Sequence, residues 1–86
     1  MKSAVYNSTD KQNLLEEITK YEVLMLEHSA IGNGKQAEYC DNRVFDLTNI
    51  LSKLCGSLEI ALNEINKFSE KNYNAVEAKV LNLTRE

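Results

Sequence analysis

The sequence predicts an all-α fold, and three observations lead to that prediction. The chain of 86 residues contains no proline and only three glycines, so nearly every obligatory helix breaker is absent. Its apolar fraction of 43% is ordinary for a soluble domain. Apolar residues also recur in alternating steps of three and four, the spacing that places side chains on one stripe of an α-helix. A chain of this length is expected to form one domain over residues 1–86.

The first predicted helix spans about residues 10–31. Thr9 followed by Gln12 matches a capping box, in which the hydroxyl accepts a hydrogen bond from an early helical N–H and the glutamine side chain reaches back. Apolar residues lie on two faces of this helix, which is typical of a helix covered on two sides. Two glycines and an asparagine then offer the left-handed conformations that end a helix, so a turn is expected at 32–35.

The second predicted helix is long and spans about residues 36–68. It carries the recurring apolar positions, here termed the seam: Ala37, Cys40, Val44, Leu47, Leu51, Leu54, Leu58, Ala61, Ile65 and Phe68. At about 1.5 Å per residue the seam makes a rod of roughly 48 Å. Gly56 lies inside it and should cost roughly 1 kcal/mol relative to alanine. Because the spacing passes through Gly56 unchanged, we interpret this glycine as a weak point or a close-packing site rather than as a turn.

A short third helix, or a bent continuation of the second, is expected over about residues 72–84. The polar run at 69–72 interrupts the spacing. A last apolar set then resumes it one residue out of phase: Tyr73, Val76, Val80 and Leu83. The predicted architecture is therefore an antiparallel helical hairpin plus a short C-terminal helix.

The first predicted helix is too short to cover the second. About 21 residues make roughly 32 Å, against roughly 48 Å for the seam. We therefore expect the chain to complete a bundle by oligomerisation, as a dimer or a higher oligomer, or to bind a helical segment of another protein. The distal half of the seam is the expected partner interface: Leu51, Leu54, Leu58, Ala61, Ile65 and Phe68. Tyr6 and Tyr39, near helix ends, are further candidates for partner contact, whereas Tyr21 and Tyr73 are expected in the core.

The residues that carry chemistry in other proteins form no recognisable site in this sequence. His28 is the single histidine, and zinc needs three or four ligands, so we interpret it as a residue favoured by the helix dipole near a C-terminus. Cys40 and Cys55 fall on one predicted helix, on the order of 22 Å apart, whereas a disulfide spans at most about 7 Å between Cα atoms. Catalysis by either thiol would require a base and an orienting group in a cleft. We expect no enzyme activity, no cofactor and no metal.

Charge and hydropathy restrict the classes of partner. The net charge is -3, and acidic and basic residues are interspersed, so no basic patch offers itself to a phosphate backbone. The sequence has no run of about 18 apolar residues, and its first residues lack the apolar core of a signal peptide. We therefore expect a cytoplasmic protein with neither a nucleic-acid nor a membrane partner.

Two stretches resemble the flagellin-export chaperone family. Residues 25–31 read Met-Leu-Glu-His-Ser-Ala-Ile, similar to the family's Met-Leu-Tyr-Asp-Gly-Ala-Ile run. Residues 50–59 read Ile-Leu-Ser-Lys-Leu-Cys-Gly-Ser-Leu-Glu, similar to its Ile-Ile-x-x-Leu-x-x-Ser-Leu-Asp pattern. The two stretches cover 17 residues in the family's order, with Glu27 and His28 in place of the Tyr-Asp pair. The resemblance implies a helical bundle that holds an amphipathic segment of an export substrate in a hydrophobic groove.

These observations predict a non-enzymatic helical protein-interaction module, chaperone-like or adaptor-like, that binds itself or an amphipathic helix of a partner. An alternative is a small phage or mobile-element regulator that blocks a host protein or sequesters a small ligand between subunits. The small size and the lack of catalytic residues permit this alternative. A third class is a hydrolase that uses Cys55.

Overall fold

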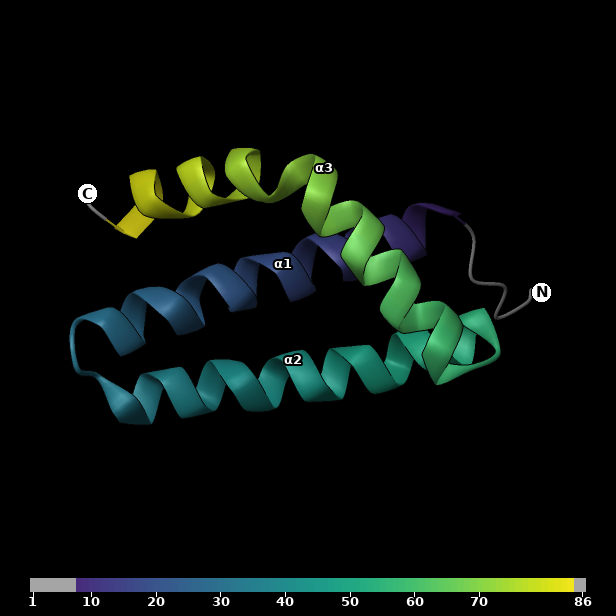
Figure 1. Cartoon of the computed structure of the whole chain (residues 1–86), viewed down its shortest axis with the longest axis horizontal. Helices are drawn as coiled ribbons and strands as arrows, with labels where there is room; N and C mark the ends of the chain where they lie inside the picture. Colours follow the sequence, from purple (N-terminus) through teal and green to yellow (C-terminus); the bar gives the residue numbers. More distant parts are fainter. Residues whose placement is uncertain (1–7, 85–86) are drawn as a thin grey trace.

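The computed structural model describes residues 8–84, which form three α-helices (Figure 1). Helix α1 spans Ser8–Ala30, α2 spans Gly34–Cys55 and α3 spans Leu58–Thr84. No strand occurs within these residues, so the prediction of an all-α fold is confirmed. None of the helices in this described part of the chain is long and apolar enough to cross a membrane.

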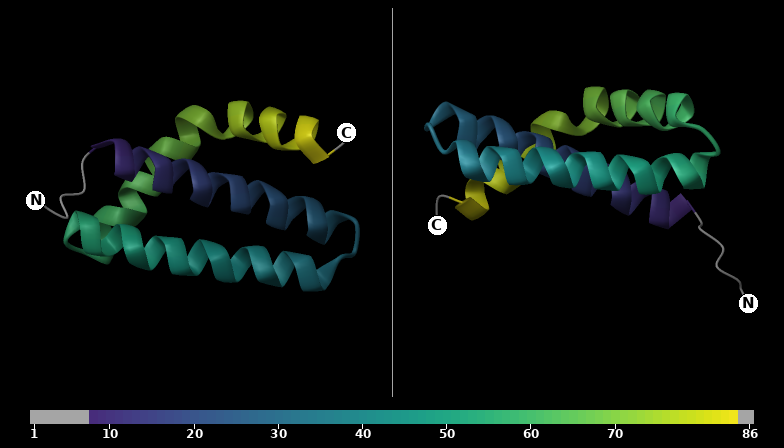
Figure 2. Two further views of the ribbon diagram at one scale, coloured as in Figure 1. Left: turned by 180° about the vertical axis from the view of Figure 1, so that it is seen from behind. Right: turned by 90° about the horizontal axis from the view of Figure 1, so that it is seen from below.

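Helices α1 and α2 form an antiparallel hairpin, joined by a turn with a Schellman motif (Figures 1 and 2). Gly32 has a left-handed φ of +79° and donates its N–H to the carbonyl oxygen of Ser29 at 3.1 Å. The N–H of Asn33 donates to the carbonyl oxygen of His28 at 2.7 Å. The Asn33 side chain then caps α2, because it accepts from the N–H of Gln36 at 3.4 Å. A turn is present as predicted, although it spans residues 31–33 rather than 32–35. Asn33 serves both helices, because its N–H closes α1 and its side chain caps α2.

The predicted long helix over 36–68 is wrong, because the chain turns after Cys55. Gly56 has φ +93° and ψ -13°, and its N–H donates to the carbonyl oxygen of Ser52 at 2.9 Å. The hydroxyl of Ser57 accepts from the N–H of Ile60 at 3.1 Å and so caps the next helix. A glycine that ends one helix is followed directly by a serine that starts another. The seam is therefore shared by two helices rather than carried by one rod.

Helix α3 crosses α1 near the N-terminal end of α1 and then bends (Figures 1 and 2). After the bend it runs in the same general direction as α1, on the side of α1 away from α2 in Figure 1. Within α3 the side-chain amide of Asn72 donates to the carbonyl oxygen of Phe68 at 3.1 Å. The predicted separate short helix over 72–84 is wrong, because these residues continue α3, which begins at Leu58 and passes through the polar run at 69–72.

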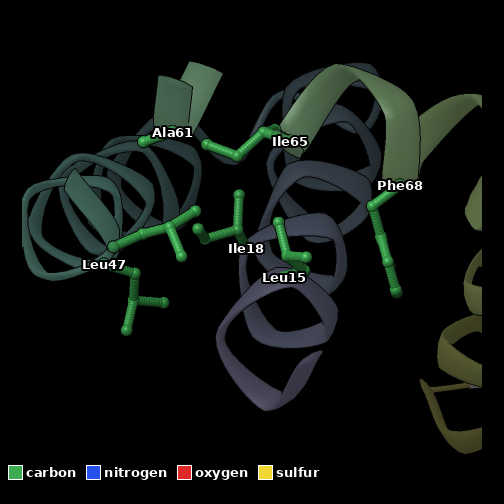
Figure 3. Close-up of a cluster of buried hydrophobic side chains, with 7 residues drawn as sticks. Leu15, Ile18, Leu47, Ala61, Ile65 and Phe68 are labelled. Carbon is green, nitrogen blue, oxygen red and sulfur yellow. The ribbon is translucent and has the colours of Figure 1, made fainter. Parts of the chain in front are cut away.

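The core draws on all three helices (Figure 3). Its buried apolar cluster consists of Leu15 and Ile18 from α1, Leu47 and Leu51 from α2, and Ala61, Ile65 and Phe68 from α3. Thr19 is the buried polar residue beside this cluster, and its hydroxyl donates to the carbonyl oxygen of Leu15 at 2.9 Å. Helix α1 packs against both other helices, as the sequence predicts, although Leu26 near its C-terminal end stays exposed.

Candidate functional site

Most of the predicted partner interface is buried inside the chain. Four of its six residues belong to the core: Leu51, Ala61, Ile65 and Phe68. Leu54 is half-buried, and Leu58 keeps 52% of its surface exposed. The expectation that the distal seam reaches beyond its cover is therefore wrong. The difference arises from the turn at Gly56, which folds α3 back. The two halves of the seam then pack against each other and against α1.

An open apolar groove lies between the middle of α2 and the first turns of α3. It has a volume of about 460 Å³, and its apolar lining comes from Val44, Phe45, Leu58 and Leu62. Phe45 is 66% exposed, Leu58 52% and Leu62 46%. Val44 is half-buried and packs against the core cluster. The groove, here termed the α2–α3 groove, is thus an apolar surface continuous with the core.

The local structure explains why these side chains meet. Phe45 follows Val44, so it lies about 100° further around α2, at the edge of the core-facing stripe. Leu58 begins α3, and Leu62 lies one turn later on the same face. The turn at Gly56 places this face of α3 beside α2. Sequence reasoning missed Phe45 and Leu62, and the signal that could have found Leu62 is the glycine-serine pair that ends one helix and starts the next.

One carboxylate lines the groove, and two more lie one helical turn from residues that line it. Asp41 lines it and lies one turn before Phe45 on the same face of α2. Glu38 precedes Asp41 by three residues, and Glu59 precedes Leu62 by three residues, so each lies next to a groove residue on its own helix. All three carboxylates are exposed. Among the described residues, no lysine or arginine lines the groove. Glu38, Asp41 and Glu59 are here termed the acidic border.

A second pocket, of about 330 Å³, lies between α1 and α3. Its apolar lining comes from Val76 and Val80, and its charged lining from two glutamates and two lysines. One lysine and one glutamate of this lining form an ion pair, in which the Nζ of Lys20 lies 3.1 Å from a carboxylate oxygen of Glu17. The lining contains charges of both signs, so the pocket does not favour a ligand of either sign. The ion pair is also partly exposed to solvent and contributes little.

An aromatic contact ties α1 to α2. The rings of Tyr21 and Tyr39 lie edge to face, with centroids 6.5 Å apart. The guanidinium of Arg43 lies 5.7 Å from the centroid of Tyr21, a cation–π distance. Tyr21 packs against the core cluster as predicted, and Tyr39 is exposed. Tyr6 lies outside the described residues.

The two thiols and the histidine differ in burial and in their surroundings. Cys40 and Cys55 both lie on α2 and both are free, as the sequence predicts. Cys40 is buried, and burial raises the pKa of its thiol. The Nδ1 atom of His28 is buried without a hydrogen-bond partner. Within residues 8–84, no three His, Cys, Asp or Glu side chains are grouped so that they could hold a metal ion.

Carboxylates gather near the phenol of Tyr73. Burial raises the pKa of this phenol, and the negative charges of Glu77, Glu22 and Glu27 raise it further. Burial also raises the pKa of the Glu22 carboxyl. These effects couple α1 to the C-terminal half of α3 and make the ionisation of Glu22 a factor in stability.

No family model matches the chain, and no curated protein or solved structure matches it either. The resemblance to the flagellin-export chaperone family therefore stays a prediction. The candidate site rests on the geometry and the charge of the α2–α3 groove.

Proposed function

We propose that the chain is a non-enzymatic protein-interaction module that binds a helix in the α2–α3 groove. The observation that carries this proposal is the gathering of Phe45, Leu58 and Leu62, each about half exposed, in one groove. Large apolar side chains gathered on a surface are typical of interaction sites. A groove between two helices suits an amphipathic helix, which lays its apolar face along it. Other exposed apolar residues, such as Ile31 and Ile60, lie outside the groove.

The exposed apolar area indicates a binding mode of modest strength. Complete burial of one Phe or Leu side chain contributes about 1.5–3 kcal/mol, so burial of the exposed halves of three such residues contributes on the order of 3 kcal/mol. This corresponds to about a hundredfold in affinity. A chaperone-like or adaptor-like protein that must release its client is suited by such reversible binding, which is also the mode that the family resemblance implies.

Two occupants satisfy this function: a helix of another protein, or a second copy of the chain that completes a bundle. Sedimentation equilibrium over a range of concentrations detects the second copy. Titration with a fluorescent amphipathic leucine-rich peptide of about 18 residues detects the first, and this length is enough for a helix to form on binding.

Two matched variants connect either result to the groove. Phe45→Asp places a charge in the groove, and we expect it to abolish peptide binding or self-association. Ile50→Asp makes the same change at a residue that is 44% exposed but outside the groove, and it should leave both unchanged. Five residues separate the two positions, a rotation of about 140° around α2. A folded monomer that binds no apolar helix would refute the proposed function.

A further inference from the structure

We propose that the occupant of the α2–α3 groove is a basic amphipathic helix of another protein. This inference rests on the proposed function and narrows it to one class of partner. The apolar floor would bury leucine-like side chains of the partner, and the acidic border would pair with lysines or arginines on either side of its apolar stripe.

The charge in the lining of the groove is negative, and the charges one turn away are mostly negative, with Lys53, one turn after the lining residue Asn49, as an exception. Asp41 is the charged residue in its lining, and the other polar lining residues, Asn42, Thr48 and Asn49, are uncharged. Glu38 and Glu59 extend the border along α2 and α3. A cationic side chain that enters the groove therefore meets the Asp41 carboxylate and no lysine or arginine in the lining.

This bias belongs to the groove and not to the surface as a whole. The pocket between α1 and α3 is lined by Lys20 and Lys79 as well as by glutamates. A further hollow where α3 crosses α1 is lined by Lys67 and Lys71 together with Glu64 and Glu70. In both places lysines offset the carboxylates, as the interspersed charge of the sequence leads one to expect. The α2–α3 groove is the described pocket with a large apolar lining and acidic charge alone.

Charge also argues against a second copy of this chain as the occupant. In a two-fold dimer the same patch faces itself, so the two acidic borders would lie against each other. Each chain also carries a net charge of -3. Like charges brought together across an interface oppose association, whereas opposite charges favour the correct partner and speed the encounter. A basic amphipathic helix offers both an apolar stripe for the floor of the groove and cations for its acidic border.

The test uses the full chain and three fluorescent peptides of about 18 residues, a length at which a helix can form. The first has leucines at i, i+3, i+4 and i+7 with lysines on either side of the stripe. The second replaces the lysines by glutamates, and the third scrambles the lysine peptide so that no stripe remains. We expect the chain to bind the first at least about tenfold more tightly than the other two, and to lose affinity as salt rises from about 50 mM to about 500 mM.

Charge-neutralising variants locate the effect. Asp41→Asn combined with Glu59→Gln should weaken binding of the lysine peptide by about threefold to tenfold, because exposed ion pairs each contribute little. Glu16→Gln combined with Glu70→Gln changes the net charge equally, at exposed residues that do not line the groove, and should have no such effect. All variants are conservative and exposed, so circular dichroism should show an unchanged fold.

The outcomes separate this inference from the proposed function. Equal, Phe45-dependent binding of the lysine and glutamate peptides would keep the interaction module but overturn the basic partner. Self-association that excludes the peptides would do the same, with a second copy as the occupant. Equal binding of the scrambled lysine peptide would reduce the effect to non-specific attraction and overturn the inference. A monomer that binds none of the peptides would overturn both proposals.

Discussion

The backbone N–H of Gly56 donates to the carbonyl oxygen of Ser52 at 2.9 Å, and this bond ends α2. The left-handed φ of +93° at Gly56 redirects the chain, so that α3 begins two residues later at Leu58. Through this turn, Ala61 and Ile65 meet Leu51 in one core instead of extending a rod. The same turn brings α3 beside α2 and creates the groove between them.

Gly56→Ala should destabilise the fold by about 1–2 kcal/mol, the cost of a left-handed conformation for a residue with a side chain. The space around Gly56 is open, so the cost lies in the backbone and not in a steric clash. Urea denaturation followed by circular dichroism measures it. Gly34→Ala is the matched control, since that position is equally open, lies at the start of α2 and has no positive φ. There we expect a gain of about 0.4–1 kcal/mol. Equal effects of the two substitutions would show that the turn does not require glycine.

Leu51→Ala should cost about 2–5 kcal/mol, the usual range for a buried leucine whose removal leaves a cavity. Leu51 is 0% exposed, whereas its neighbour Ile50 is 44% exposed. Ile50→Ala should therefore stay within about 0.5 kcal/mol of the parent chain, as exposed positions do. The free energy of unfolding from denaturant titration compares the two. If Leu51→Ala proved as mild as Ile50→Ala, the seam residue would not be part of the core.

Cys55 should react with iodoacetamide faster than Cys40 in the folded chain. Cys40 is 3% exposed, and the pKa raised by its burial leaves less of the reactive thiolate. Cys55 is half-buried. Mass spectrometry of the alkylated peptides over time measures both rates, and unfolding in denaturant should bring them together.

Glu22→Gln should stabilise the chain near neutral pH. Burial raises the pKa of Glu22 above its ordinary value of 4.5, so just above that value the folded chain binds more protons than the unfolded chain. The free energy of unfolding then falls as the pH rises through this window, and the ionised carboxylate is a cost at pH 7. The advantage of glutamine should vanish below the unfolded-state pKa. Thermal unfolding across this pH range measures the difference.

A matched control for this pH effect is Glu16→Gln, which removes one charge from an exposed position on the same helix. It should show no comparable gain on passing from acidic to neutral pH. A pH-independent difference between Glu22→Gln and the parent chain would contradict the role assigned to burial of the carboxyl.

The features that the sequence predicts correctly depend on neighbouring residues. The absence of proline favours helix everywhere, and the Gly32–Gly34 segment supplies its own left-handed residue and its own cap. The pairing of α1 with α2 follows from this short turn. The candidate site was harder to predict, because Phe45 lies off the seam and has no distinctive neighbour in the sequence. Its importance appears when Leu58 and Leu62 lie beside it.

Local residues thus settle the helical class, the hairpin and the stripe that each helix buries. Periodicity reports which side of a helix is apolar, and it carries no information on the direction in which the helix axis continues. The spacing through Gly56 is therefore the same for one rod and for two helices that share a core. Contacts between distant residues, such as Ile18 with Leu51 and Ala61 in one buried cluster, favour the folded-back chain because they remove apolar surface from water. Those contacts turned most of the expected interface into core and left Leu58, with Phe45 and Leu62, as the exposed groove.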